Sequence, residues 1–428
     1  MPQMDSLGLE RMKLFNVYSQ QIEPFVPQGG SITVYVCGIT PYDTTHLGHA
    51  FTYTTFDLLI RYLEYRGHAV RYVQNVTDID DDILRKAKEV GEDWKGLGDR
   101  WTAHFIRDMQ AINVRPPDDF PRATDVIPEI ISQVEDLLGA GAAYESGGNV
   151  YFHVDAWADF GRLSRIPRDQ MLPIANERGN RPDDPRKRDP LDFVLWQAQA
   201  PGEPAWESPW GSGRPGWHIE CSTMATHLLG NTVDVHGGGA DLVFPHHECE
   251  IAQAECATAQ SPFVRFWLHA AMVHHEGEKM SKSLGNLVMV RDLLRSWSPD
   301  AIRLYLAQHH YREVWSHNLE ELERAEGLAR KLRQAATIGN GTGVPFDLPW
   351  LQTAFTQAMQ DDLNTPAALR ALERAAEEIG AAKRAGKEVQ AGQEVLRRAA
   401  QVFGLTLDVA EAEVAVVKGW NEHLRRFT

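Results

Sequence analysis

The chain has few cysteines and no long apolar run, and each scarcity excludes a class of protein. Only four cysteines occur among its 428 residues: Cys37, Cys221, Cys249 and Cys256. A disulfide framework is therefore not expected, and metal binding or catalysis is the better question to ask of these thiols. No run of about 18 uninterrupted apolar residues is present, so the sequence predicts no membrane span. Residues 1–11 contain acidic side chains and lack an apolar stretch of signal-peptide length. We expect a cytoplasmic protein with a short leader over residues 1–12.

Positive charge is also scarce. Lysine and arginine number 43 against 59 aspartates and glutamates, which gives a formal net charge of −16. This balance argues against a protein that coats nucleic acid generally, although it leaves room for a local basic patch on an acidic body. The hydrophobic fraction of 43% is typical of a globular protein with a sizeable core. The length predicts two to three domains.

A strand, a turn, a helix and a second strand follow one another near the N-terminus. The β-rich run 32–36 ends at Cys37, a helical pattern covers about 46–66, and a second β-rich run covers 69–73. This order and spacing predict a βαβ unit in a parallel sheet. The fold class expected is therefore α/β.

The rest of the chain changes character from mixed to helical. Strand-like runs occur at 149–153, 232–236 and 266–273, and the last of these is the final strand expected. Residues 165–190 are expected to be rich in loops. From about residue 318 the pattern is almost wholly helical, and its one clear break is the Gly/Pro-rich stretch 338–349. Thr365 and Pro366 after this break predict an N-cap and a first helical position.

The first chemical motif is His46-Leu47-Gly48-His49, where a turn opens the predicted helix. A helix N-terminus offers unpaired N–H groups and a favourable dipole to phosphate. Two histidines three residues apart lie on one helix face, and Gly48 lets a nucleotide approach the backbone. Alternatively, His46 and His49 are solvated or capping residues.

The second motif is the Gly/Ser-rich segment 279–286, which begins Lys279-Met280-Ser281-Lys282. Two lysines three residues apart can counter the charge that develops on a leaving pyrophosphate. Taken alone, the pentapeptide 279–283 strongly suggests an ordinary solvated basic loop.

The third group contains thiols, imidazoles and carboxylates. Cys37 lies at a strand end, Cys221 follows Trp217-His218, and His246 and Glu250 are four residues apart on one helix face. These residue types can all bind Zn²⁺. Ligands this scattered are not recognisable by spacing, and buried free cysteines are often packing residues, so both interpretations stay open at this point.

In this order, the histidine motif and the lysine loop resemble the paired signatures of class I aminoacyl-tRNA synthetases. Over residues 13 to about 407, the chain is similar to the cysteinyl-tRNA synthetase family. The segments that carry this match are 36–38, 72–81, 187–192, 213–221 and 236–239. The resemblance implies a ligase with a Rossmann-like parallel-sheet catalytic domain, an inserted subdomain and a C-terminal helical bundle.

The resemblance also implies a ligand set. In the family, the positions matching Cys37, Cys221, His246 and Glu250 hold one zinc ion that coordinates the substrate thiolate. A soft metal favours a thiolate over the hydroxyl of serine, which shape alone discriminates poorly. Cys249 and Cys256 match no ligand and are expected to be packing residues.

Further site residues are carried over from the family. His46, Gly48, His49, Lys279 and Lys282 are expected to bind ATP, and the histidines and lysines are expected to be catalytic. Thr77, Trp217 and Asp241 match residues of the cysteine pocket, and Gly38 and Thr40 lie beside Cys37. The implied reaction is attack of the cysteine carboxylate on the α-phosphate of ATP, which Mg²⁺ accompanies.

Two branches of the family differ in the acceptor. One transfers cysteine to tRNA(Cys), and the other, the mycothiol ligase, transfers it to the amine of glucosaminyl-inositol. Glu250, together with segments 78–82 and 279–286, favours tRNA, whereas segments 38–43 and 177–185 match the mycothiol ligase. We expect the tRNA ligase, with the amino-sugar ligase as the alternative. A non-catalytic protein that senses cysteine or nucleotide is a third hypothesis.

The domain organisation expected is a catalytic domain over 13–335 and a helical bundle over 336–428. The inserted region is expected at about 118–205, and the region with the lysine loop at about 271–335. About 20 residues follow Leu407, which is too short for an independent domain that reads the anticodon. An anticodon-binding domain is therefore expected to be truncated.

Overall fold

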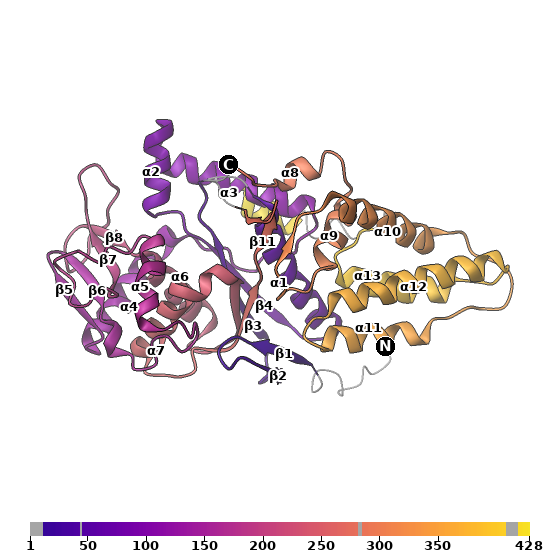
Figure 1. Ribbon diagram of the computed structural model, residues 1–428, viewed down its shortest axis with the longest axis horizontal. Coiled ribbons are helices and arrows are strands. Elements are labelled where there is room, and N and C mark those ends of the chain that lie inside the picture. Colours follow the sequence, from indigo (N-terminus) through magenta and orange to yellow (C-terminus); the bar gives the residue numbers. More distant parts are fainter. Residues whose placement is uncertain (1–11, 43–44, 281–284, 408–417) are drawn as a thin grey trace.

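A computed structural model of the chain describes residues 12–42, 45–280, 285–407 and 418–428 (Figure 1). The predicted leader lies almost entirely outside these ranges. A central sheet separates a mixed α/β region, built largely from residues 127–258, from an elongated bundle of helices near the C-terminal end of the sequence (Figure 1). No helix among the described residues is long and apolar enough to cross a membrane.

The central sheet has four parallel strands in the order β10-β9-β3-β4. Their bounds are β3 Ile32–Ile39, β4 Val70–Val76, β9 Val233–Gly239 and β10 Val264–Ala270. Strand β3 is buried almost throughout and rich in β-branched and aromatic side chains, which suit a strand covered on both faces. The predicted βαβ unit and its parallel pairing are confirmed.

Helix α1 (Leu47–Tyr65) connects β3 to β4 and packs along the central sheet. Its interior is dominated by buried apolar residues, as a crossover helix requires. A fully buried ion pair joins Asp57 of α1 to Arg303 of helix α9 (Pro299–Ala307). Arg303 also donates to the carbonyl oxygens of Ile112 and Asn113. This arginine therefore fastens the crossover helix to the C-terminal half of the chain.

The region between β4 and β9 carries its own antiparallel sheet. Its strand order is β5-β6-β7-β8, with bounds Ala143–Ser146, Asn149–Phe152, Phe193–Ala198 and Gly213–Pro215. The helices of this region are α2 Asp81–Val90, α3 Trp94–Ala111, α4 Ile127–Gly139, α5 Arg168–Glu177 and α6 Trp217–Leu229. Helix α5 lies inside the segment 165–190, which was expected to be rich in loops, and it contains Pro173.

Helix α7 (Glu248–Thr258) precedes β10, and short strands follow β10 in the sequence. Strands β11 (Val273–His275), β12 (Glu278–Lys279) and β13 (Trp315–Ser316) form a small sheet. The expectation that 266–273 is the final strand region was wrong, because β12 and β13 are two-residue strands that leave almost no periodic signal. Helix α8 (Val290–Leu293) lies between β12 and α9.

Long helices form the C-terminal bundle: α10 Leu319–Thr337, α11 Pro349–Gln360, α12 Thr365–Arg384 and α13 Gln390–Val402. The predicted break at 338–349 falls between α10 and α11. The cap prediction for α12 was wrong by one residue, because Asn364 accepts the hydrogen bond from the Ala367 N–H at 3.0 Å. The bundle helices share one hydrophobic core with the central sheet. A short hairpin of β1 (Lys13–Asn16) and β2 (Gln21–Pro24) completes the fold.

Candidate active site and metal centre

A large cavity opens where β3, β4 and β9 end, which is the edge at which parallel α/β sheets bind ligands. Its volume is about 970 Å³. Most residues predicted to act on ATP, cysteine or metal line it. They are Cys37, Gly38, Thr40, His46, Gly48, His49, Thr77, Trp217, Cys221, Asp241 and His246. The structure thus brings together residues that lie up to about 200 positions apart in the sequence.

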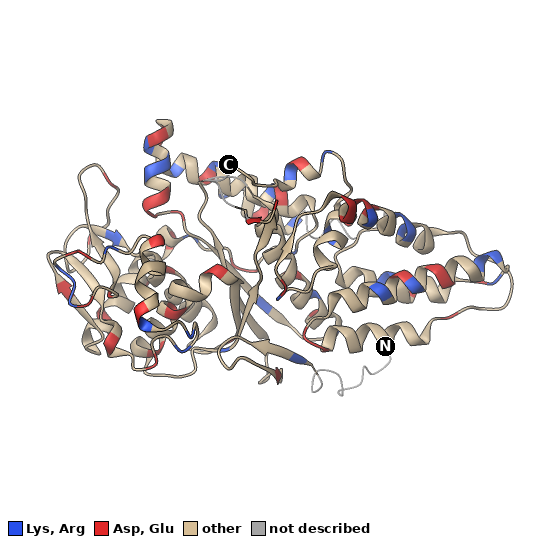
Figure 2. Ribbon diagram, in the orientation of Figure 1, with Lys and Arg blue, Asp and Glu red and all other residues tan. Residues whose placement is uncertain are grey.

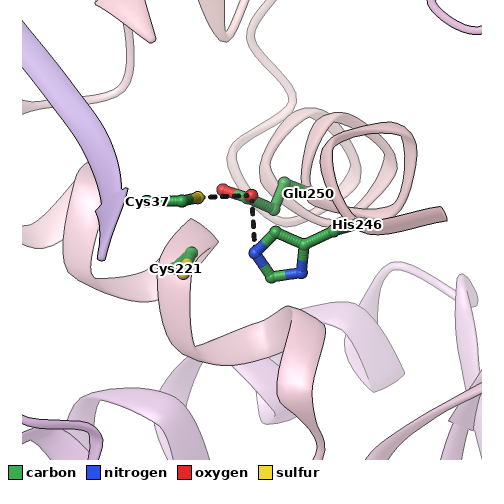
Figure 3. A group of neighbouring side chains, drawn as sticks. All are labelled: Cys37, Cys221, His246 and Glu250. Atoms are coloured by element: carbon green, nitrogen blue, oxygen red, sulfur yellow. Dashed lines mark hydrogen bonds and ion pairs between the residues drawn. The ribbon is translucent and has the colours of Figure 1, made fainter. Parts of the chain in front are cut away.

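Four donor side chains meet at one buried place in this region (Figure 3). Cys37 comes from β3, Cys221 from α6, His246 from the turn before α7, and Glu250 from α7 itself. Their donor atoms all lie within 4.8 Å of one another. Glu250 Oε1 lies 3.5 Å from Cys37 Sγ and 3.1 Å from His246 Nε2. These separations are close to the roughly 3.3–3.8 Å expected between ligands of a tetrahedral zinc ion.

The chemistry of this donor set also fits a cation. Glu250 is completely buried, and its Oε2 accepts no hydrogen bond from the described residues. Burial raises the pKa of Glu250, Cys37 and Cys221 and lowers the pKa of His246. A divalent ion would compensate the cost of deprotonating three buried acids, and the soft thiolates favour zinc.

A second set of possible ligands shares Cys37 and Glu250 with the first. His236 Nε2 lies 3.6 Å from Cys37 Sγ, and His247 Nε2 lies 3.3 Å from it. Sequence analysis missed both histidines. Neither lines the cavity, whereas Cys37, Cys221 and His246 do. An ion in the predicted set would face a ligand in the cavity, and an ion held by His236 and His247 would not.

Neighbouring aromatic groups hold His246 in place. Trp217 stacks on its ring with centroids 4.4 Å apart, and His218 shares a hydrogen bond between the two Nδ1 atoms at 3.0 Å. Burial lowers the pKa of His218 to about 3, so this ring is neutral. A partner at Nδ1 leaves Nε2 of His246 directed at Glu250, as a metal ligand requires. Trp217 lines the cavity as well as stacking on His246, and its predicted contact with cysteine stays a prediction.

The histidine motif lies at the beginning of α1, as predicted. His46 is the N-cap, and its Nδ1 accepts from the Gly48 N–H at 3.1 Å. The rings of His46 and His49 stack with centroids 3.9 Å apart. The capping interpretation is therefore correct for His46. It does not compete with the nucleotide interpretation, because the helix N-terminus faces the cavity.

The lysine loop is described only at its ends. Lys279 ends strand β12, paired with His274 of β11, and Lys282 lies outside the described residues. Met280 and Leu287, on either side of the loop, line the cavity. The roles of the two lysines stay predictions.

Gly38 and Thr77 are joined by Asn75, a residue that sequence analysis missed. The Gly38 N–H donates to Asn75 Oδ1 at 2.8 Å, and Asn75 Nδ2 donates to Thr77 Oγ1 at 3.3 Å. A Cβ at Gly38 would lie 1.5 Å from the Asn75 carbonyl oxygen, so only glycine fits. The sequence signal that would have identified Asn75 was a polar side chain at the end of a buried strand.

Asp241 has a partner that was also missed. Arg178, at the end of α5, donates to Asp241 Oδ2 at 3.1 Å, and both residues line the cavity. The pair joins the inserted region to the turn after β9 across the cavity. Asp80, another missed residue of the lining, is the N-cap of α2, and burial raises its pKa to about 7.

The basic segment 186–188 is engaged within the protein. Arg186 donates to Asp184 at 2.8 Å, Lys187 donates to Asn180, and the Arg188 guanidinium lies 4.0 Å from the Tyr144 ring centroid. The charged side chains of this segment therefore bind other residues of the same chain.

Comparison with known proteins defines the class first. Over 93% of both chains, the fold matches Mycobacterium tuberculosis methionyl-tRNA synthetase in complex with methionyl-adenylate, with a TM-score of 0.61 and 17% sequence identity. This likeness shows a class I synthetase fold. Residues 24–327 match the family model described as tRNA synthetases class I (C) catalytic domain, and residues 354–408 match the DALR domain.

The particular family follows from curated relatives. A cysteine--tRNA ligase from Dehalococcoides mccartyi is 44% identical over 94% of this chain and 87% of its own length. An L-cysteine:1D-myo-inositol 2-amino-2-deoxy-alpha-D-glucopyranoside ligase from Mycolicibacterium smegmatis is 47% identical over 85% of this chain and 88% of its own length. The chain belongs to the cysteinyl-tRNA synthetase family of class I ligases.

Proposed function

We propose that the protein activates L-cysteine with ATP and transfers it to tRNA(Cys). The observation that carries this proposal is the metal-donor group of Cys37, Cys221, His246 and Glu250, three of which line the same cavity as the N-terminus of α1. Such a site can hold a thiol substrate and a nucleotide together. Since the reaction uses ATP and tRNA, we expect it in the cytoplasm.

The zinc ion, held by these four residues, would supply a Lewis acid that prefers the thiolate of cysteine to the hydroxyl of serine. Cys37, Cys221 and Glu250 would hold the ion through buried donor atoms. Trp217 stacks on His246, so an apolar indole forms the cavity wall beside this donor. Discrimination between the two amino acids would then rest on the ion as well as on shape.

The first half-reaction needs no nucleophile from the protein. The carboxylate of cysteine attacks the α-phosphate of ATP, an oxygen–phosphorus bond forms, and pyrophosphate leaves with Mg²⁺. His46, Gly48 and His49 at the start of α1 would bind the phosphates, and Lys279 and Lys282 would stabilise the leaving group. Gly38, Thr40, Thr77 and Asp241 would orient cysteine, with Asp241 beside its ammonium group.

In the second half-reaction, a hydroxyl of the terminal ribose of tRNA attacks the activated carbonyl, and AMP leaves. The alternative acceptor is the amine of glucosaminyl-inositol, which relatives of this chain use by name. Both acceptors require the same cysteinyl-adenylate. A non-catalytic sensor would bind cysteine or ATP without exchanging pyrophosphate.

One experiment separates these functions. Purified protein receives ATP, Mg²⁺ and radiolabelled cysteine, and then tRNA(Cys) or glucosaminyl-inositol in parallel. Label on tRNA alone supports the proposal, and label on the amino-sugar alone refutes tRNA as the acceptor. Failure of cysteine-dependent ATP–pyrophosphate exchange would refute the activation step itself. Cys221→Ser, compared with a Cys256→Ser control outside the donor group, tests whether preference for cysteine over serine depends on the ligands.

A further inference from the structure

We propose that a cationic and aromatic surface on α3 and α8 binds the single-stranded 3′ end of the acceptor RNA. This surface, the α3–α8 cluster, consists of Arg100, Trp101, His104, Arg107 and Arg291. The inference rests on tRNA as the acceptor and assigns where its end approaches the cavity.

The cluster is one continuous stripe of side chains. Arg100, His104 and Arg107 are spaced four and three residues apart, so they share one face of α3, opposite its buried face. The indole of Trp101 lies beside them. The Arg100 and Arg291 Cζ atoms lie 5.4 and 6.0 Å from its ring centroid, and the centroid of the His104 ring lies 5.2 Å away.

The arginines of the cluster remain accessible. Arg100 and Arg107 are exposed, and Trp101 is only partly buried. Arg107 makes no hydrogen bond or ion pair with the other described residues. Arg100 pairs with Glu92 at 2.9 Å, but both side chains are about half exposed, and such pairs exchange readily for other partners.

A second ion pair that involves an arginine lies at the edge of the cluster. Arg291 of α8 lies 3.5 Å from Asp108 of α3, which holds the two helices together. Burial lowers the pKa of His104, and the nearby charges of Arg291, Arg107 and Arg100 lower it further. Because three guanidiniums influence one imidazole, their positive charge is concentrated on this small area.

The cluster borders the turn that leads into the cavity. The buried side of α3 packs beside the cavity, since a Cβ at Gly98 would lie 3.8 Å from the ring of Pro41, which stands between the cavity-lining Thr40 and Tyr42. The approach from the cluster itself runs along α8, whose Arg291 follows Val290. On the α8 side, the Val290 N–H donates to the carbonyl oxygen of Thr45 at 3.2 Å. An extended strand lying on the cluster could therefore continue into the active site.

The chemistry of the cluster suits a single RNA strand. Guanidiniums neutralise phosphates, and an indole offers a stacking surface to an unpaired base. The ammonium group of an amino-sugar would be repelled by the same charges. On the helical bundle, by contrast, lysines and arginines alternate with acidic residues (Figure 2).

The test uses the full-length protein, purified tRNA(Cys) and three variants. Trp101→Ala removes the stacking surface, and Arg107→Ala removes an accessible charge. Lys95→Ala is the matched control, because this exposed lysine of α3 lies nine residues from His104. Nine residues make two and a half turns and place Lys95 on the opposite side of the helix. Binding is measured by fluorescence anisotropy at several salt concentrations, and ATP–pyrophosphate exchange is measured in parallel.

We expect Trp101→Ala to weaken tRNA binding and to raise the KM for tRNA by about tenfold, the loss typical of one stacked base. Arg107→Ala should weaken binding and lower the slope of log K against log salt by about one. Exchange should match wild type in all variants, and this also checks folding. If the wild type charges tRNA and the two variants bind like Lys95→Ala, the surface assignment is wrong while the proposed function stands. If the wild type neither binds nor charges tRNA, the proposed acceptor is refuted, and the surface assignment with it.

Discussion

Zinc binding to the metal-free protein should release about two to three protons per ion at pH 7. Burial raises the pKa of the Cys37 and Cys221 thiols, so both are protonated at this pH and must lose a proton to become ligands. Burial also raises the pKa of Glu250, which can supply a third proton. His246 releases none, because burial lowers its pKa and keeps its ring neutral.

The proton count sets the pH dependence of zinc affinity. Each proton released changes the apparent affinity about tenfold per pH unit, and affinity rises with pH because binding expels protons. Between pH 7 and pH 6 the affinity should therefore fall about 100- to 1000-fold. At about 1.36 kcal/mol for each tenfold change, this is about 2.7–4.1 kcal/mol of binding free energy.

Isothermal titration calorimetry measures this count directly. The metal-free protein is titrated with zinc at pH 7 in three buffers of different ionisation enthalpy, and the slope of the observed heat against that enthalpy gives the number of protons. Glu250→Gln should lower the count towards two. Cys256→Ser should not change it, because this partly buried thiol lies outside the donor group. A count below about one in the wild type would show that the two thiols are not ligands.

Three further predictions concern other parts of the molecule. Gly38→Ala should lower the melting temperature and cysteine activation together, because its Cβ would overlap the Asn75 carbonyl oxygen and cost at least about 1–3 kcal/mol; an unchanged melt would contradict this. Arg303→Leu removes one of the two guanidiniums that contact the buried Asp57, which keeps its ion pair with Arg61, and should cost roughly 1–3 kcal/mol in urea unfolding; a loss under about 0.5 kcal/mol would mean that the Arg303 contact is dispensable. Lys282→Ala should slow pyrophosphate exchange about 10²–10³-fold with cysteine binding intact, whereas normal turnover would remove Lys282 from the mechanism.

Local patterns predicted the centre of the fold well. The strand 32–36 was found from its short run of β-branched and aromatic residues and the helix 46–66 from its helical pattern, and the structure has Ile32–Ile39 and Leu47–Tyr65. The inserted sheet was largely missed, since strands such as Ala143–Ser146 and Gly213–Pro215 have four residues or fewer. Their pairing depends on partners elsewhere in the chain, which local periodicity does not register.

The candidate site likewise has one part that local sequence predicts and another that only tertiary packing brings together. The helix N-terminus with His46 was predictable, because a motif at a strand-to-helix turn has a local physical meaning. The metal donors were grouped only through the family resemblance, since tertiary packing brings Cys37 to Glu250. Arg178 and His247 were missed for the same reason. Each acquires its partner, Asp241 or Cys37, only when distant segments pack together.

The scattered origin of the metal donors also has a consequence for biosynthesis. Cys37 and Glu250 are 213 positions apart in the sequence. At roughly 5–20 residues per second, the ribosome needs on the order of ten to forty seconds to make the intervening chain. Throughout that interval Cys37 is a thiol without its other ligands, open to oxidation or to capture by stray metals. A zinc ion bound as proposed would enter late, when α7 has packed against the sheet, and zinc occupancy of newly made protein would report that the catalytic domain has finished folding.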